Sequence, residues 1–447
     1  MMNRKRYAVV GTGSRCNMFI DAITGRFADQ AELVGLCDTN PTRLAYWRRK
    51  VSDAAGGEVP TFTADAFEEM VRETRPDAVI VTTVDAEHHH YIIRALELGC
   101  DAITEKPMTT DAEKAQSILD AVERTGGRVR VAFNYRYMPV FSKVREVVAS
   151  GRIGTPTLVD FQWRLDTRHG ADYFRRWHRE KSRSGGLLVH KATHHFDLVN
   201  WILNDLPDTV SAQGTTRFYG KANAEARGEQ VTYDRYTNQA GAEDDPFALH
   251  LDQDENLRSL YLEAEVDDGY VRDRNVFSDN WPLDAEDTMA VLARYRGGAI
   301  MNYSLIAYCP WEGERLTITG THGQVEYFGR GSGHVIRGQS DEELAAEQYE
   351  GEQYLRLQNM FEPPEILEIP EASGGHGGGD AGILERIFTP EEDLAPDPLN
   401  RDATHVDGVA SILLGIAANQ SIDAGGGVPI RTEDLIQWPT AAPVGRG

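Results

Sequence analysis

Cysteine, basic charge and long apolar runs are all scarce in this chain of 447 residues. Its four cysteines, Cys16, Cys37, Cys100 and Cys309, lie too far apart for a CxxC metal or redox motif. No apolar stretch approaches the length of a membrane span, and the first residues lead into a short strand rather than into a signal sequence. We therefore expect a cytoplasmic protein with reduced thiols and no membrane partner.

Acidic side chains outnumber basic ones by 70 to 46, which gives a formal net charge of -24. Such a surface repels phosphate backbones, so no nucleic-acid partner is expected. The hydrophobic fraction of 41% and the charged fraction of 26% are typical of a soluble globular chain. At this length, two domains are expected.

A glycine-rich turn lies between two expected strands near the N-terminus. An apolar run at residues 7–10 leads into Gly11-Thr12-Gly13-Ser14-Arg15-Cys16, and a second apolar strand at 32–37 ends at Asp38. In a dinucleotide site, Gly11 would make the tight turn and Gly13 would let the backbone approach a pyrophosphate at the helix N-terminus. The Asp38 carboxylate would bind the ribose hydroxyls and repel a 2′-phosphate, which favours NAD over NADP.

The alternation of strands and helices continues to about residue 133. Strands at residues 76–81, 101–104 and 129–133, with helices at 91–98 and 112–125, predict a doubly wound parallel sheet. Ligands of such sheets bind at the carboxyl ends of the strands. We therefore predict a Rossmann domain at residues 1–133. Its cofactor-binding residues are predicted to be Gly11, Gly13, Ser14, Arg15, Asp38, Thr82, Thr83, His88, Glu105, Lys106 and Asn134.

Residues 134–447 are expected to form a second α/β domain. Period-two patterns predict antiparallel strands at residues 157–163, 288–295, 299–306 and 315–319. An acidic, tyrosine-rich insertion at about 218–284 and a polar excursion at about 330–402 interrupt this domain. Long segments of this kind tend to be lids or additional surface.

Three segments, in this order and spacing, resemble the Gfo/Idh/MocA family of oxidoreductases. They are the glycine turn, the tripeptide Glu105-Lys106-Pro107, and the run from Gly185 to Asp197. The resemblance implies a Rossmann domain followed by an α/β domain with a large, open, mostly antiparallel sheet, which commonly mediates homodimers or homotetramers. It also implies that NAD is the cofactor, with a sugar or polyol over the nicotinamide.

The resemblance points to Lys106 and His194 as catalytic residues. A lysine at this strand end can stabilise the charge that develops on the reacting oxygen, and an imidazole can take the hydroxyl proton. His190 stands where the family has an aspartate. Either His190 itself binds the substrate hydroxyl, which we favour and which makes it a third catalytic candidate, or the missing carboxylate comes from elsewhere.

Several neighbouring residues complete the predicted site. Substrate contacts are predicted for Arg136, Trp163, Trp177, His178 and Lys191. His195 and Asp197 are expected to be structural, and His376 is expected to lie in a solvated loop. His190 and His194 have HxxxH spacing, but the glutamate of an HExxH motif is missing and the family uses no metal, so we expect no metal site.

The expected function is an NAD-dependent dehydrogenase or reductase acting on a ring hydroxyl or ketone of a sugar, glycoside or cyclitol. Basic residues around Lys106 and Lys191 further suggest a substrate with an anionic group. One alternative is a redox-neutral, NAD-dependent glycosidase, which the additional imidazole of His190 favours because elimination requires a further acid or base. A second alternative is a non-catalytic NAD-bound sugar sensor, which would need no proton relay.

Overall fold

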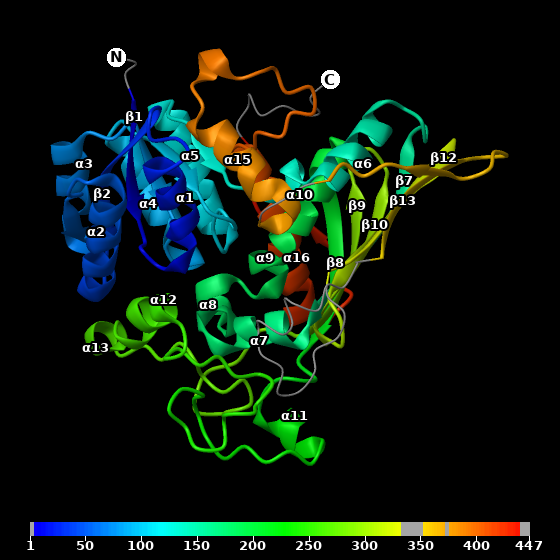
Figure 1. The fold of residues 1–447 in the computed structure, drawn as a ribbon. Coiled ribbons are helices and arrows are strands. Elements are labelled where there is room, and N and C mark those ends of the chain that lie inside the picture. Colours follow the sequence, from blue (N-terminus) through cyan, green and yellow to red (C-terminus); the bar gives the residue numbers. More distant parts are fainter. Residues whose placement is uncertain (1–3, 332–351, 372–374, 439–447) are drawn as a thin grey trace.

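The computed structural model describes residues 4–331, 352–371 and 375–438, which form two α/β units (Figure 1). The first unit, blue to cyan, holds a six-stranded parallel sheet, and the second is built on a nine-stranded sheet. The predicted fold class, a doubly wound parallel sheet followed by an α/β domain with a large, mostly antiparallel sheet, is confirmed.

The strands of the first sheet follow the order β3-β2-β1-β4-β5-β6, so the direction of winding reverses between β1 and β4. They are β1 (Lys5–Val10), β2 (Ala31–Asp38), β3 (Thr61–Thr63), β4 (Ala78–Val81), β5 (Asp101–Thr104) and β6 (Val129–Val131). The helices are α1 (Asn17–Thr24), α2 (Pro41–Ala55), α3 (Phe67–Thr74), α4 (His88–Glu97) and α5 (Ala112–Thr125). Strand β4 is buried along its whole length, as expected for a strand that helices cover on both faces. Ligands of such sheets bind beside the reversal point, at the carboxyl ends of the strands.

The sequence patterns predicted most of these helices and strands, but some of the predicted boundaries differ from the observed ones. The helix predicted at residues 91–98 begins at His88 and ends at Glu97, because polar histidines extend α4 beyond its apolar pattern. The strand predicted at 129–133 ends at Val131, where the backbone of Phe133 donates a hydrogen bond back to Val131. No prediction covered β3, which has only three residues.

The nine-stranded sheet has the order β14-β13-β12-β11-β7-β10-β9-β8-β15 and is antiparallel except between β7 and β10. Its strands are β7 (Pro156–Asp166), β8 (Pro207–Thr215), β9 (Thr288–Tyr295), β10 (Ile300–Cys309), β11 (Gly313–Gly320), β12 (Gly323–Arg330), β13 (Gln353–Asn359), β14 (Glu365–Leu367) and β15 (Ile430–Arg431). Four of them, β7, β9, β10 and β11, correspond to the strands predicted from period-two patterns.

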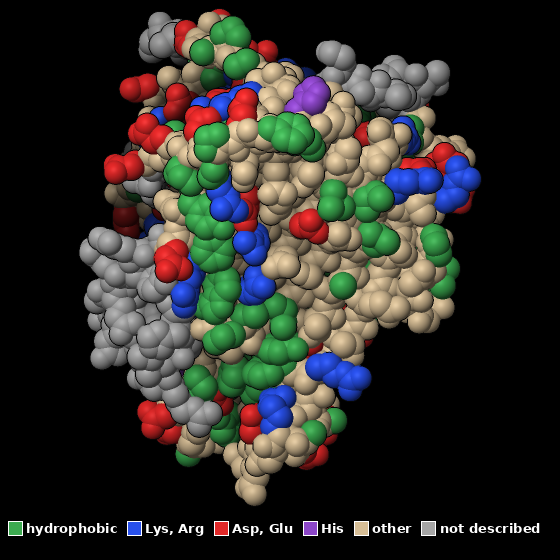
Figure 2. Space-filling view, turned by 90° about the vertical axis from the view of Figure 1, so that its right-hand side faces the viewer, with side chains coloured by type: hydrophobic (Ala, Val, Ile, Leu, Met, Phe, Trp, Pro, Cys, Tyr) green, Lys and Arg blue, Asp and Glu red, His purple; other side chains and the backbone are tan. Residues whose placement is uncertain are grey.

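Side chains alternate between the two faces of this sheet. In β9, Met289 and Val291 are buried whereas Ala290 and Leu292 are exposed. On the outer side of the molecule, hydrophobic side chains form a column flanked by Lys and Arg (Figure 2). Leu292 and Ile300 are 49% and 42% exposed there, so this face lacks a covering layer within the described chain.

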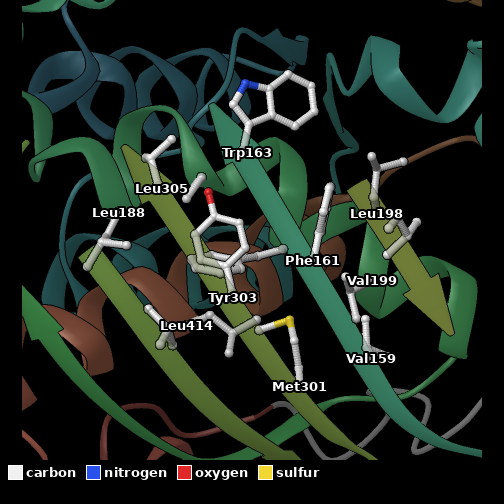
Figure 3. Packing of buried hydrophobic residues seen from close by; sticks show 14 of the residues in the cluster. Val159, Phe161, Trp163, Leu188, Leu198, Val199, Met301, Tyr303, Leu305 and Leu414 are labelled. Atoms are coloured by element: carbon white, nitrogen blue, oxygen red, sulfur yellow. The ribbon is translucent and has the colours of Figure 1, made fainter. Parts of the chain in front are cut away.

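The other face of the sheet packs against helices α6 (Pro139–Ala149), α10 (Ala192–Leu203) and α16 (His405–Asp423). Figure 3 shows Phe161 and Met301 of the sheet in the same buried cluster as Leu198 of α10 and Leu414 of α16. This packing fixes the start of α10, and with it His194, relative to the sheet.

The acidic insertion lies between β8 and β9. Its regular elements are α11 (Lys221–Ala226), α12 (Glu255–Leu257), the π-helical turn η6 (Arg258–Leu262) and α13 (Glu265–Asp268). In Figure 1, α12 and α13 lie beside the first unit and α11 lies far from it. Leu260 and Tyr261 belong to the same buried cluster as Trp47 of α2, so the insertion packs on the first unit.

Part of the polar excursion, residues 332–351 and 372–374, lies outside the described residues. The remainder contributes β13, β14 and α15 (Gly379–Phe388). The ring of Phe388 meets that of Tyr7 edge-on at 5.0 Å, which packs α15 against β1. Within the described ranges, no helix is long and apolar enough to cross a membrane.

Candidate active site

The glycine turn after β1 has the geometry of a phosphate-binding turn. Gly11 has a φ of +88°, and a Cβ there would lie 2.6 Å from the carbonyl carbon of Thr82, so only glycine fits. At Gly13, by contrast, an added Cβ would meet nothing within 4 Å, which leaves the backbone open to a ligand. The Trp47 indole donates to the Thr12 carbonyl at 2.9 Å and holds the turn in place. These residues fit the pyrophosphate of a dinucleotide.

Asp38 lies at the carboxyl end of β2, beside this turn. Its carboxylate is only 4% exposed and accepts hydrogen bonds from the Thr12 hydroxyl at 2.9 Å and the Asn40 amide at 2.8 Å. The Arg43 guanidinium lies 3.7 Å away. A fixed acidic group therefore stands where the ribose of a dinucleotide would lie.

The strand ends around the turn are tied together by polar contacts. Arg15 donates to Glu105 at 2.6 Å, and the Thr82 hydroxyl donates to the Gly11 carbonyl at 2.5 Å. Asn134 donates to Asp380 of α15 at 2.6 Å. The structure thus brings together predicted cofactor-binding residues from the ends of β1, β4, β5 and β6.

His88 is buried, and its ring contacts the protein backbone on both sides rather than facing the cofactor site. Its ring nitrogens lie 2.8 Å from the Pro107 carbonyl oxygen and 3.1 Å from the Thr83 carbonyl oxygen. The ring therefore braces the turn that carries Lys106 against the turn after β4, and the half-buried Thr83 lies beside it.

Lys106 and His190 meet next to this edge of the sheet. The Lys106 ammonium lies 3.5 Å from the His190 carbonyl oxygen, and burial lowers the pKa of Lys106 to about 8. His190 ends the short helix α9 (Leu187–His190), and its Nδ1 lies 2.5 Å from the carboxylate of Asp85 in the turn after β4. A carboxylate absent from position 190 is thus supplied to the site by Asp85.

This contact determines how His190 can act. Because Nδ1 faces Asp85, Nε2 is the nitrogen left for a substrate hydroxyl. Burial, and then the nearby Lys106 charge, lower the pKa of His190 well below its ordinary value. The imidazole is therefore neutral at neutral pH and can accept a proton.

His194, near the start of α10, stacks on the Tyr135 ring at 4.1 Å. Its Nδ1 is buried and has no hydrogen-bond partner among the described residues. Burial, and then the Lys106 and Lys191 charges, lower the pKa of His194 well below its ordinary value. A buried imidazole with an unsatisfied nitrogen is suited to receive a proton or a hydrogen bond from a ligand.

Aromatic side chains surround these groups. The Trp177 ring stacks on His178 at 3.9 Å, and His178 in turn lies 4.4 Å from His190, which brings both predicted substrate residues next to it. Lys191 is buried, and its ammonium donates to the Tyr135 hydroxyl at 3.1 Å. It lies 5.1 Å from the Trp163 ring centre.

Arg136 is the predicted substrate residue that the structure leaves out of this cluster. It is 1% exposed, and its Nε donates to Asp197 at 2.7 Å while another guanidinium nitrogen donates to Asp407 at 3.0 Å. The guanidinium joins α10 to α16, and because both carboxylates bind it, it is not available to a substrate. Asp197 has the structural role expected of it.

His195 also turns away from the catalytic cluster. Its ring stacks on Trp163 at 4.0 Å, and its Nδ1 lies 2.6 Å from the Tyr303 hydroxyl of the sheet. His195 is therefore held by Trp163 of β7 and Tyr303 of β10.

Sequence reasoning missed Asp85 and Tyr135. His376 is exposed, as expected of a residue in a solvated loop, and its ring lies 5.8 Å from the Tyr135 ring with its Nδ1 2.9 Å from Asp380. The sequence could have indicated Asp85, because this residue follows a buried strand at the edge of the sheet where ligands bind. Within the described residues, no group of three His, Cys, Asp or Glu side chains is placed to hold a metal ion.

Comparisons with known proteins agree with this geometry. Residues 5–133 match the family model described as the oxidoreductase family, NAD-binding Rossmann fold, and residues 145–430 match the C-terminal alpha/beta domain of the same family. The chain belongs to the Gfo/Idh/MocA family of oxidoreductases, and its first unit is the family's NAD-binding Rossmann fold.

The chain is also similar to individual members of the curated proteins and solved structures. The protein YteT of Bacillus subtilis is 38% identical over 416 residues, which cover 89% of this chain and 90% of that protein. An inositol 2-dehydrogenase of Rhizobium meliloti is 28% identical over 283 residues, 60% of this chain and 80% of that one. The structure of the WlbA dehydrogenase from Bordetella pertussis in complex with NADH and UDP-GlcNAcA aligns with a TM-score of 0.60 at 20% identity, over 96% of this chain and 99% of that chain. At this identity the last similarity shows the fold alone.

Proposed function

We propose that this protein is an NAD-dependent dehydrogenase or reductase that transfers a hydride between the nicotinamide and a ring hydroxyl or ketone carbon of a sugar, glycoside or cyclitol. One observation carries the proposal: Lys106, His190 and His194 lie together beside the carboxyl ends of the Rossmann strands, among buried aromatic rings. A sensor would have no need of three titratable groups at this place.

Each side chain has a distinct task in the proposed reaction. Bound NAD supplies the hydride acceptor. Lys106 donates a hydrogen bond to the reacting oxygen and stabilises its developing negative charge. His194, neutral at neutral pH, accepts the hydroxyl proton during oxidation and returns it during reduction. His190, oriented by Asp85, binds a neighbouring hydroxyl through Nε2.

The proposal is tested by single-turnover absorbance of NADH after mixing enzyme, NAD and a panel of sugars, glycosides and cyclitols. At least one compound should give NADH with the unaltered protein. Lys106→Met should abolish it while NAD binding, measured by fluorescence, is kept. Lys221→Met is the matched control, because Lys221 is an exposed lysine paired with Asp279 in the insertion. A Lys106→Met protein that is fully active would refute the assigned role.

A second function, redox-neutral glycoside cleavage, is favoured by the His190–Asp85 pair. Oxidation of a ring hydroxyl acidifies the adjacent C–H, a base removes that proton, and the aglycone leaves. Water then adds to the double bond, and the hydride returns to the ketone. This sequence needs one more acid or base than simple oxidation, and an imidazole paired with a carboxylate can provide it. Release of an aglycone without net NADH is the distinguishing readout.

We further propose a homodimer or homotetramer that forms through the open face of the nine-stranded sheet. The column of hydrophobic side chains in Figure 2 and the exposure of Leu292 and Ile300 support this arrangement. Leu292→Asp should lower the molar mass measured by light scattering to that of the monomer. An unchanged mass would exclude this face as the interface.

A further inference from the structure

The acidic insertion reaches the cofactor side of the molecule, and we infer that residues 254–268 form a strap over the adenosine end of the NAD site that slows release of the cofactor after hydride transfer. This inference rests on the proposed function for its assignment of the glycine turn and Asp38 to the cofactor. The contacts that carry it join parts of the chain more than 200 residues apart.

The first set of contacts holds the loop that follows Asp38. Asn40 donates to the Ala264 carbonyl at 2.9 Å, and the Thr42 amide donates to Asp267 at 3.1 Å. Arg43 donates to Asp268 at 3.0 Å with one nitrogen while the other lies 3.7 Å from the Asp38 carboxylate. The strap is therefore linked through a single guanidinium to the residue predicted to bind the ribose.

The second contact is at the glycine turn itself. The Ser14 amide donates to the Tyr261 hydroxyl at 3.3 Å. This amide belongs to the start of the helical segment where a pyrophosphate would accept hydrogen bonds. A hydroxyl that accepts from the amide can also donate to a phosphate oxygen, so Tyr261 has the chemistry of a cofactor contact.

Apolar packing reinforces the strap. Leu260 and Tyr261 are 3% and 8% exposed and belong to the buried cluster that contains Leu44 and Trp47 of α2. The Tyr46 hydroxyl also donates to Asn256 of the strap. Lifting the strap therefore breaks several hydrogen bonds and exposes apolar surface, which makes opening slow compared with the motion of a free loop.

The rest of the insertion is anchored to the second unit. Arg179 is fully buried and donates to the Asn275 carbonyl at 3.5 Å and the Ser278 carbonyl at 3.3 Å. Arg274 pairs with Glu180 at 3.1 Å. Because one end of the insertion is fixed to the substrate-binding unit, the strap couples the two units across the cofactor.

Two conservative variants test the inference without removing the insertion. Tyr261→Phe deletes only the hydroxyl, and Asp268→Asn deletes only the charge that pairs with Arg43 and Arg272. Tyr233→Phe is the matched control, because the Tyr233 hydroxyl bonds to Asp245 within the insertion and away from the cofactor loops. The rate of NADH release is measured by stopped-flow fluorescence, by displacing bound NADH with excess NAD, and the melting temperature confirms folding.

Release from the unaltered protein should be slower than hydride transfer and should limit turnover, and NAD(H) should remain with the protein through purification. The double variant Tyr261→Phe/Asp268→Asn should release NADH about tenfold faster or more, as expected for the loss of two polar contacts, whereas Tyr233→Phe should not. Equal release rates in all these proteins would overturn the inference. If the unaltered protein oxidises a sugar but exchanges cofactor freely, the strap is refuted while the proposed function stands.

Discussion

The Nδ1 of His190 lies 2.5 Å from the carboxylate of Asp85, a residue 105 positions earlier in the chain. His190 occupies the position at which the family resemblance leads one to expect an aspartate. The structure brings a carboxylate from elsewhere to this imidazole and leaves its Nε2 for the substrate hydroxyl that we propose it binds.

Asp85→Asn should therefore lower kcat while leaving NAD affinity unchanged. Burial raises the pKa of Asp85 well above its ordinary value, so this carboxyl can exchange a proton with the imidazole. The amide keeps the volume but cannot exchange a proton, and a loss of about 100-fold is the scale of general acid–base assistance. Steady-state kinetics and fluorescence titration of NAD measure the two effects separately. Asp65→Asn, at an exposed aspartate of the same unit, is the control. Unchanged kcat in Asp85→Asn would leave the pair with a purely structural role.

The pH dependence of sugar oxidation should show an alkaline limb near pH 8. Burial lowers the pKa of Lys106 to about 8, so its ammonium loses the proton that stabilises the oxyanion as pH rises through that value. The lowered pKa of His194 keeps this base neutral down to pH values below 6.5, so the acidic limb should fall there. A kcat/KM profile in the unaltered protein and in Lys106→Arg checks this, since arginine should remove the alkaline limb. A limb that persists in Lys106→Arg would belong to another group.

Asp38→Ala should narrow the preference for NAD over NADP, mainly through weaker NAD binding. The carboxylate is buried and fixed by Thr12 and Asn40, so it cannot turn away from a 2′-phosphate. Intrinsic fluorescence titration of both cofactors measures the change. Equal affinities for the two cofactors in the unaltered protein would contradict the assignment of Asp38.

Arg136→Met should destabilise the fold without altering the chemistry. Removing one partner of a buried ion pair leaves Asp197 uncompensated, which costs about 3–5 kcal/mol in the free energy of unfolding. Urea denaturation measures this loss, and the KM of the remaining folded enzyme for sugar should be unchanged. A raised KM with normal stability would restore Arg136 to the substrate site.

A substrate with an anionic group should be preferred over its neutral counterpart. The hypothesis rests on two cationic side chains, Lys106 beside the His190 carbonyl group and the adjacent, buried Lys191, in a chain that is acidic as a whole. Comparing kcat/KM for a neutral sugar and the corresponding uronate decides the point. A clear preference for the neutral sugar would end this hypothesis.

The first unit could be predicted because its signals are local. Each strand, turn and helix follows the previous one in the sequence, and the carboxyl-end rule then placed Thr82, Glu105 and Lys106 at one edge. Four of the nine strands of the second sheet were predicted from period-two patterns. The strand order was not predicted, since β7 pairs with β10 and β11 across more than 100 residues.

The rest of the site depends on tertiary packing that no local pattern encodes. Arg136 follows the Rossmann unit directly, yet its burial against Asp197 and Asp407 follows from how α10 meets α16. His376 reaches Tyr135 because α15 packs back onto the first unit. The approach of the insertion to the cofactor loops likewise joins segments more than 200 residues apart.

The most direct test of the account follows NADH and nitrophenol together after mixing the enzyme with excess NAD and a nitrophenyl glycoside that it binds. We predict a burst of one NADH per active site and no nitrophenol, with later NADH limited by cofactor release. Nitrophenol released over many turnovers with no net NADH would contradict a dehydrogenase and establish redox-neutral cleavage.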